Sequence, residues 1–516
     1  MAALRLAELL AGLSLTIDLG GGAPLEKGLR TCAVATVLAD GLELDPPDRR
    51  AVYHAALLMG LGCTAHAPEN AAMFEDDIRF AAALRVLDAG DPTVIAEQMA
   101  RFGSWARHEP AGVLAARFAA AAPTVGPVAG RASCEVSAAL GRQIGLPAAA
   151  IAALDDVHER WDGLGLPAGR SGDQITLAGR IVHVAEQAVI ADAVGGRAAA
   201  RAEVARRAGG HLDPELCVRF AEHGDDILSA LDEPDLLAAV VAREPSPAAT
   251  VDHDRLEAVA GALATFADLK GRWLPGHSTQ VARLSDAAAG LLGCGDDVRA
   301  TLRVAALLHD LGRVSVPSSV WDRPGPLGAA DRERVRLHPH WTDRILAGCP
   351  PLAGLAAVAA AHHERLDGSG YHRGARASDL DVPARVLAAA DVLSALTEDR
   401  PHRTALALHD AARVLQAEVA AGKLDGEAAS ALIEAAGMPR PRTEWPCHLT
   451  DREVEVLRLG ARGLSNKEIA GELVVSSRTV QHHLASVYDK TGRRTRAGAA
   501  VFAIEHGLVP ASSTGG

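Results

Sequence analysis

Apolar residues at helical spacing run through most of the chain, and one such run ends in two polar side chains. Residues 305–308 (AALL) predict the end of a buried helix, and they lead directly into His309 and Asp310 and then into Gly312. A carboxylate beside an imidazole at the end of an apolar helix is costly to bury unless a partner compensates its charge. A metal ion is the partner that this pair favours most.

The composition predicts an almost entirely α-helical protein. Of the 516 residues, 48% are hydrophobic, mostly Ala, Leu and Val, and only 3% are aromatic. Such a composition favours close-packed helices over sandwiches or barrels. The length predicts about three domains, because single cores rarely grow past roughly 250 residues. Prolines in residues 243–250 and 438–446 mark two breaks, so we expect domains at 1–243, 251–437 and 447–510.

Charge, cysteine spacing and hydropathy restrict the class of protein. The net charge of -13 argues against a surface that coats nucleic acid along its whole length, although it allows a local basic patch. The seven cysteines are scattered without a C-x-x-C pair, which predicts neither a disulfide framework nor a thiolate zinc site. Arg117 and Pro123 interrupt the Ala-rich stretch at 111–130. We therefore expect a cytoplasmic protein without a membrane partner.

The chain contains one unit twice. Residues 55–62 (AALLMGLG) match residues 305–312 (AALLHDLG) at an offset of 250. Residues 158–165 (HERWDGLG) match residues 363–370 (HERLDGSG) at an offset of 205. Because these landmarks recur in the same order, we expect two copies of one helical bundle.

The second copy carries histidines and aspartates on or beside apolar helical patterns. A lone histidine on an Ala/Leu helix is more often a core or surface residue than a ligand. Adjacent pairs such as His309–Asp310 and His362–His363 are harder to explain by packing, because one helical step of about 100° can direct both side chains toward a common centre. Mixed imidazole and carboxylate ligands suit Fe, Mn, Zn or Ni better than Mg. The candidate ligands are His277, His309, Asp310, His338, His362, His363 and Asp391.

Five motifs in this copy occur in a fixed order: HDLGR at 309–313, HP at 338–339, HHERLDGSGYHRG at 362–374, DVLSAL at 391–396 and DRPHR at 399–403. Together they resemble the HD superfamily of metal phosphohydrolases, and specifically its HD-GYP branch, over about residues 270–415. The resemblance implies a helical bundle around a binuclear metal centre that hydrolyses the phosphodiester cyclic di-GMP. Two ions favour such a displacement at phosphorus.

The resemblance also implies roles for individual residues. The seven candidate ligands would bind two divalent transition metal ions, Fe or Mn first and Zn or Ni as alternatives. Asp310 would bridge the ions and, with Arg313, would be catalytic. The expected substrate contacts are Gly368, Gly370, Tyr371, Arg400 and Arg403. Two departures from the family pattern are Arg313 in place of lysine and His372 in place of the proline of Gly-Tyr-Pro, and Trp273 argues against a third metal.

The first copy has lost these ligands. Its equivalents of His277, His309, Asp310, His338, His362 and Asp391 are Lys27, Met59, Gly60, Ser133, Val157 and Glu186, and only His158 remains. Lysine and methionine cannot rebuild a dinuclear site, so we predict no catalysis there. The retained hydrophobic pattern favours packing, ligand sensing or dimerisation, and His158 is expected to be structural.

Residues 447–510 predict four short helices. Thr450 with Glu453 and Ser465 with Glu468 form capping boxes, Ser476 or Ser477 caps a third helix, and Gly492 ends it. The motifs are LTDRE at 449–453, SNKEIA at 465–470, SSRTVQHH at 476–483 and KTG at 490–492. They resemble the helix-turn-helix of LuxR-type regulators. From residue 477 to 496 the net charge is +4, which suits contacts with DNA phosphates.

The third helix would be the recognition helix in the major groove of double-stranded DNA. Val480, Leu484 and Val487 lie at helical spacing and would be core. The expected base contacts are Arg478, Gln481 and His482, and the expected phosphate contacts are Lys467, Ser477, Thr479 and Lys490. One such module has a small interface, so we expect a homodimer on two half-sites.

Two hypotheses follow. The first is a DNA-binding transcriptional regulator that carries an HD-GYP-like metal-dependent phosphohydrolase, a phosphodiesterase acting on cyclic di-GMP or another nucleotide. The alternative is a non-catalytic one-component transcription factor whose HD units only sense a ligand or mediate dimerisation. Retention of all seven ligand positions in the second copy favours the first hypothesis.

Overall fold

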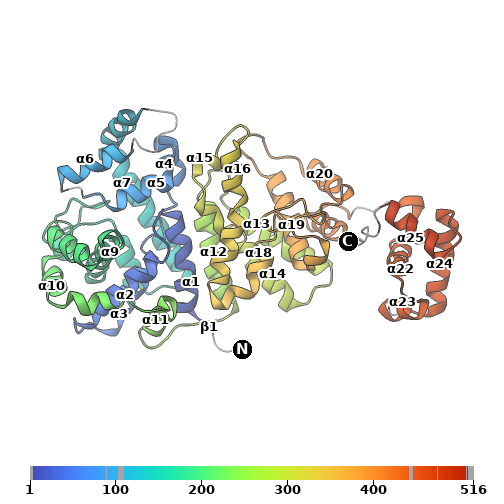
Figure 1. Cartoon of the computed structure of the whole chain (residues 1–516), viewed down its shortest axis with the longest axis horizontal. Helices are drawn as coiled ribbons and strands as arrows, with labels where there is room; N and C mark the ends of the chain where they lie inside the picture. The colour runs from blue at the N-terminus through green and yellow to red at the C-terminus, as the bar shows by residue number, and fades with distance from the viewer. Residues whose placement is uncertain are drawn as a thin grey trace. The chain divides into compact units, whose positions relative to one another are not determined.

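The computed structural model describes residues 4–88, 90–102, 110–440, 445–473, 475–506 and 508. The predicted all-α class is confirmed, because the only strands among these residues are the two-residue β1 (Leu4–Arg5) and β2 (Thr250–Val251), which pair antiparallel. The chain divides into two compact units, Met1–Ala436 and Gly437–Gly516 (Figure 1). The predicted break at 438–446 begins just after this division, whereas the break at 243–250 joins two repeats inside one unit.

The first repeat is built around three central helices. Its elements are α1 (Leu6–Gly20), α2 (Lys27–Asp40), α3 (Pro46–Leu58), α4 (Ala67–Phe74), α5 (Asp77–Arg85), α6 (Pro92–Phe102), α7 (Ala111–Ile144), α8 (Ala148–Asp155), η1 (Gly172–Gln174), α9 (Leu177–Arg207), α10 (Pro214–Ser229) and α11 (Leu236–Ala242). Helices α2, α3 and α9 pack against one another. Their facing residues, such as Val34, Tyr53 and Ile181, are fully buried.

The second repeat follows the same plan. Its elements are α12 (His253–Asp268), α13 (His277–Leu291), α14 (Asp296–Leu308), η2 (Leu311–Ser315), α15 (Ser318–Trp321), α16 (Ala329–Arg336), α17 (His338–Ala347), η3 (Pro350–Leu355), α18 (Ala356–Ala359), η4 (Ala377–Asp379), α19 (Val382–Thr397), α20 (Leu408–Ala420) and α21 (Gly426–Ala435). Here α13, α14 and α19 form the equivalent triple. Asp268 accepts from the backbone N–H of Ser278 at 3.1 Å, as Asp18 accepts from Gly28 at 3.2 Å in the first repeat.

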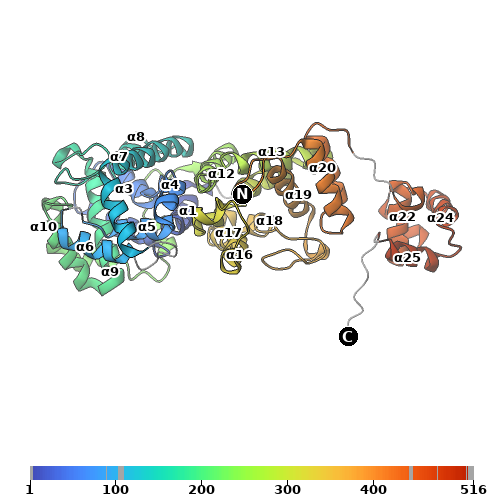
Figure 2. The same ribbon diagram turned by 90° about the horizontal axis from the view of Figure 1, so that it is seen from above.

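The two repeats pack directly on each other. Helix α1 of the first repeat contacts η2 and α17 of the second, and Figure 2 shows α17 near α1. The Thr64 hydroxyl donates to the Phe266 carbonyl at 2.8 Å. Lys270 is fully buried and forms an ion pair with Asp77, which also accepts from the Ser318 N–H at 2.8 Å. The first repeat therefore supports the turn that follows His309 and Asp310.

One described helix is long and apolar enough to cross a membrane by length and composition, Gly112–Ile144 within α7. Arg117 and Pro123 interrupt the apolar composition of this stretch but not its helix, because α7 continues through both and through Pro127. Each proline removes one backbone hydrogen bond, and the many surrounding alanines have the highest helix propensity.

The C-terminal unit contains the four predicted helices. Its elements are η5 (Pro446–His448), α22 (Asp451–Ala461), α23 (Asn466–Glu472), α24 (Ser477–Thr491) and α25 (Arg496–Glu505). Both capping boxes are present. Ser476 caps α24, and Gly492 ends it in a left-handed conformation, as predicted. Val480, Leu484 and Val487 are buried, so the predicted core face of this helix is confirmed.

A buried ion pair takes the place of the ligands in the first repeat. Lys27, the equivalent of His277, pairs with Glu186, the equivalent of Asp391, and its ammonium lies 3.0 Å from the sulfur of Met59. Their side chains are only 7% and 12% exposed. Burial raises the pKa of Glu186, but Lys27 outweighs that effect and keeps it below its usual value. The ammonium group of Lys27 thus compensates the charge of the buried Glu186 carboxylate.

Replacing Lys27 by methionine should leave Glu186 buried without a countercharge. We expect the Lys27→Met variant to lose about 3–5 kcal/mol in its free energy of unfolding, measured by urea denaturation, because one partner of a buried pair is removed. Adding Glu186→Leu should recover most of the loss. Arg30→Met is the matched control on α2, since Arg30 lies 3.9 Å from Glu26 at the surface and should matter by less than about 1 kcal/mol. A loss no larger than that of the control would contradict the interpretation.

Candidate metal centre and nucleic-acid interface

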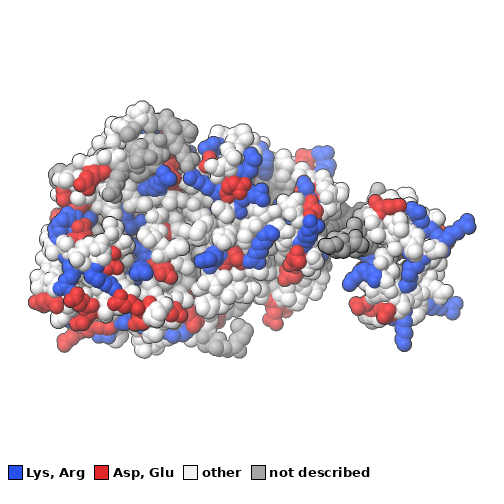
Figure 3. All heavy atoms as spheres, in the orientation of Figure 1, with Lys and Arg blue, Asp and Glu red and all other residues white. Residues whose placement is uncertain are grey.

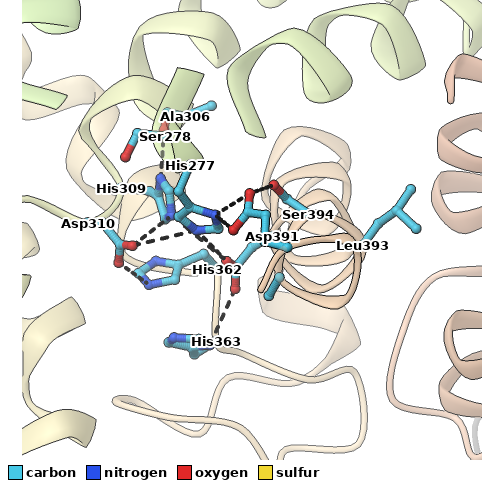
Figure 4. A network of polar contacts seen from close by, with 12 residues as sticks. His277, Ser278, Ala306, His309, Asp310, His362, His363, Asp391, Leu393 and Ser394 are labelled. Atoms are coloured by element: carbon cyan, nitrogen blue, oxygen red, sulfur yellow. Dashed lines mark hydrogen bonds and ion pairs between the residues drawn. The ribbon is translucent and has the colours of Figure 1, made fainter. Parts of the chain in front are cut away.

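Seven side chains from five separate segments meet in the second repeat. His277 begins α13, His309 and Asp310 follow α14, His338 begins α17, His362 and His363 follow α18, and Asp391 lies within α19. Figure 4 shows the six of these that it labels pointing toward one centre. The structure thus brings together the full set of candidate ligands.

The carboxylates lie between the imidazoles. Asp310 Oδ1 is 3.2 Å from Nε2 of His338 and 3.5 Å from Nε2 of His362, while its Oδ2 is 3.3 Å from Nε2 of His309. Asp391 Oδ1 is 3.3 Å from Nε2 of His277, and Asp391 Oδ2 is 3.6 Å from Nδ1 of His363. These residues form two groups, and within each group the ligand atoms lie within 4.8 Å of one another. One group is His277, His309 and Asp310, and the other is His338, His362 and His363.

Several donor atoms at this centre have no hydrogen-bond partner. Among the described residues, Nε2 of His277, Nε2 of His309 and both carboxylate oxygens of Asp310 are buried without one. Buried polar atoms are normally hydrogen-bonded, and orphaned ones require an explanation. Nitrogen and oxygen lone pairs directed at a common point fit divalent transition metal ions.

Backbone carbonyls set the orientation of three imidazoles. Nδ1 of His309, His338 and His362 donates in each case to the carbonyl three residues earlier. The acceptors are Ala306 at 2.7 Å, Val335 at 2.6 Å and Ala359 at 2.8 Å. A carbonyl oxygen only accepts, so each Nδ1 carries the proton and each Nε2 presents a lone pair to the centre, where the Nε2 atoms of His338 and His362 lie 2.9 Å apart.

The imidazoles at the centre differ in protonation. Burial lowers the pKa of His277, but hydrogen bonds to Asp391 and Glu398 outweigh it and raise that pKa to about 9, and Asp310 raises the pKa of His309 in the same way. Burial raises the pKa of Asp310, but Arg313 and His309 hold it well below its usual range. Burial, aided by neighbouring positive charge, lowers the pKa of His363 to about 3 and that of His362 well below 6.5. Metal ligands must be deprotonated, so the carboxylates, His362 and His363 are already in the required states, whereas His277 and His309 would release a proton when a metal binds.

Two arginines flank the centre, and a third is held away from it. Arg313 is 2.6 Å from Asp310 Oδ2, and its guanidinium lies 4.4 Å from the ring centroid of Trp321. Arg400 is 2.7 Å from Glu398. Arg403 donates to backbone carbonyls at the end of α19, so its predicted phosphate contact stays a prediction.

The loop after His363 is held by a glutamate that we did not predict. Glu364 is buried and accepts from the N–H groups of Arg373 and Ala375 at 2.8 and 2.9 Å. These bonds place Tyr371 with its ring 4.7 Å from that of His363. A Cβ at Gly370 would lie 2.5 Å from Glu364 Cα, so only glycine fits. Gly368 has φ +81°, which likewise favours glycine.

The first repeat keeps the same loop support. Glu159 accepts from the N–H groups of Ala168 and Arg170 at 2.8 and 2.9 Å. The sequence contained a signal for this role, because HER is identical in both repeats although the metal ligands are not. His158 lies 3.3 Å from Ser133 Oγ, a contact between side chains of the repeat itself that fits its expected structural role.

The C-terminal unit presents the predicted recognition face. Ser477, Arg478, Gln481 and His482 are exposed on α24, and Lys467 is exposed on α23. Figure 3 shows lysine and arginine side chains gathered on the visible face of this unit. The Thr479 hydroxyl bonds Ser476 at 2.8 Å, and Lys490 bonds Glu453 at 2.7 Å. These two polar groups are thus held by neighbours, whereas the three expected base readers face outward.

Comparison with known proteins assigns both units. Residues 262–428 match the HD domain family, and residues 448–503 match the bacterial regulatory proteins of the luxR family. The chain is 29% identical over 457 residues to 3'3'-cGAMP-specific phosphodiesterase 3 of Vibrio cholerae serotype O1, which covers 87% of this chain and 98% of that protein. It is 37% identical over 128 residues to cyclic di-GMP phosphodiesterase PA4108 of Pseudomonas aeruginosa, covering 25% of this chain and 31% of the relative.

A solved structure has a similar fold over both repeats. The crystal structure of the cyclic GMP-AMP specific phosphodiesterase V-cGAP3 of V. cholerae aligns with a TM-score of 0.58 at 24% identity, over 84% of this chain and 98% of that one. The likeness therefore includes the first repeat, which lies outside the match to the HD domain family. The chain thus contains an HD domain in its second repeat and a domain of the luxR family of bacterial regulatory proteins in its C-terminal unit, and its relatives include HD-GYP-type phosphodiesterases.

Proposed function

We propose that the protein is a DNA-binding transcriptional regulator whose second repeat hydrolyses a 3'3'-linked cyclic dinucleotide with two divalent metal ions. One observation supports the catalytic part: all seven candidate ligands converge, and Nε2 of His277 and Nε2 of His309 are buried there without a hydrogen-bond partner among the described residues. The substrate class comes from the relatives, whose names specify 3'3'-cGAMP and cyclic di-GMP.

The residues at the centre divide into ligands and phosphate contacts. One ion would be held by His277, His309 and Asp310, and the second ion would be held by His338, His362 and His363. The carboxylates of Asp310 and Asp391 would lie between these two groups of ligands. When bound, such ions lower the pKa of a water molecule and stabilise the attacking and leaving oxygens of a displacement at phosphorus. We favour Fe or Mn, with Zn or Ni as alternatives.

Arg313 and Arg400 supply fixed positive charge. The guanidinium of Arg313 is held between Asp310 and the Trp321 ring, so its role is electrostatic, since an arginine does not readily release a proton. Arg400 is placed to contact phosphate oxygens, because guanidinium groups bind phosphate through parallel N–H donors. Tyr371 and the loop held by Glu364 would contact the rest of the substrate.

The C-terminal unit would bind double-stranded DNA as a homodimer. Helix α24 would lie in the major groove, with Arg478, Gln481 and His482 at base edges. Lys467, Ser477, Thr479 and Lys490 would contact phosphates. We place this regulator in the cytoplasm, where both DNA and a cyclic dinucleotide would be accessible.

The second candidate is a regulator whose HD domains bind the cyclic dinucleotide without hydrolysing it. Its supporting observation is the first repeat, which keeps the helix triple and the loop glutamate without the ligands. The substrate assays below separate the two candidates.

Metal analysis tests the centre directly. Wild-type protein purified with Mn²⁺ or Fe²⁺ should contain about two metal ions per chain by mass spectrometry of the elements, and His309→Ala should lose at least half of them. His409→Ala is the control, because His409 is 67% exposed on α20 and lies outside the centre. Absence of transition metal from carefully prepared wild type would overturn the proposed centre.

Hydrolysis of 3'3'-cGAMP and cyclic di-GMP tests the chemistry. Asp310→Asn should lower kcat at least about 100-fold, because it removes the negative charge shared by both groups of ligands. Arg400→Ala should raise KM more than it lowers kcat, and Arg413→Ala on the surface of α20 should change neither. Tight binding of a cyclic dinucleotide without turnover in metal-loaded wild type would favour the non-catalytic candidate.

DNA binding tests the recognition helix. For an operator selected from genomic fragments, the double variant Arg478→Ala/Gln481→Ala should weaken binding about tenfold to hundredfold or more and relax sequence preference, measured by fluorescence anisotropy across a salt series. Arg462→Ala is the control, since it removes one exposed positive charge outside α24. An unchanged affinity and salt dependence in the double variant would refute the assignment.

A further inference from the structure

One histidine of the centre is oriented differently from the others. His277 is the first residue of α13, and the Leu274 carbonyl three residues earlier already accepts its backbone N–H at 2.8 Å. Its Nδ1 donates to the carboxylate of Glu398, at 2.9 Å from Oε2 and 3.1 Å from Oε1. No sequence motif singled out Glu398.

Glu398 is itself held in place from two sides. It follows the last residue of α19 and is 22% exposed. The Ser394 hydroxyl, one helical turn earlier, donates to Oε1 at 2.6 Å, and Figure 4 shows Ser394 beside His277. Arg400 donates to Oε2 at 2.7 Å. The carboxylate thus connects a candidate metal ligand to a candidate phosphate-binding arginine.

We propose that Glu398 is a positioning residue that fixes the proton on Nδ1 of His277, so that Nε2 binds the metal, and that also holds Arg400 for the substrate phosphate. This inference rests on the proposed metal centre. A carboxylate behind a ligating imidazole fixes its ring and makes it a stronger ligand, and loss of such a partner typically weakens metal binding 10–100-fold.

Two substitutions separate the negative charge of Glu398 from its ability to accept a hydrogen bond. In Glu398→Gln the amide oxygen can still accept from Nδ1, but the negative charge is lost. In Glu398→Ala both are lost, and His277 Nδ1 and Arg400 lose this acceptor together. We therefore expect metal affinity to fall about 10–100-fold in Glu398→Ala and by a smaller factor in Glu398→Gln.

The experiment measures Mn²⁺ and Zn²⁺ affinity by competition with a chromophoric chelator, together with Tm in the metal-free and metal-loaded full-length protein. Glu418→Ala is the matched control, because Glu418 lies on α20 of the same repeat and pairs only at the surface, 3.3 Å from Lys423. Arg400→Ala should raise KM for the cyclic dinucleotide while leaving metal affinity unchanged. Glu398→Ala should change both.

The outcomes separate the inference from the function on which it rests. A smaller metal-induced rise of Tm in Glu398→Ala, at unchanged metal-free Tm, supports positioning. Equal metal affinity in wild type and Glu398→Ala, or a parallel fall of both Tm values, overturns the inference. Wild type that binds metal tightly but hydrolyses no cyclic dinucleotide overturns the proposed catalysis alone, and wild type that binds no metal overturns both.

Discussion

Two carboxylates buried among five imidazoles impose the constraint on which the second repeat depends. Asp310 and Asp391 carry charges that the interior cannot hold without compensation. The elements around them are arranged to supply it, with Arg313 against Asp310 and His277 against Asp391. The first repeat meets the same constraint differently, because Lys27 pairs with Glu186 from the position that the candidate ligand His277 occupies in the other copy.

Much of this centre could be predicted from the sequence, and the reason is local. Each His-Asp or His-His pair sits where an apolar helix ends, and three of the imidazoles are oriented by a carbonyl three residues earlier, so short motifs carry most of the geometry. The helix caps of the C-terminal unit are local in the same sense. They were predicted for the same reason, since a capping box spans only four residues.

Residues whose role depends on distant partners could not be predicted in this way. Glu398 meets His277 across 121 positions of sequence, and nothing near it in the chain marks it as different from other acidic residues. The compactness of the tandem repeats was also missed, because the prolines at 243–250 suggest a boundary while the packing of α1 on η2 joins the two sides. Helix α7 shows the converse, since local proline signals were outweighed by the many alanines around them.

Because α1 and the turn after Asp310 belong to one chain, their contact does not depend on protein concentration. In a protein with a single copy of this unit, a neighbour that supports the turn would have to be recruited from solution. Here the supporting copy is tethered in the same polypeptide, so its effective concentration is fixed by the linker rather than by expression level. The turn that carries the candidate ligands therefore keeps this support at any protein concentration.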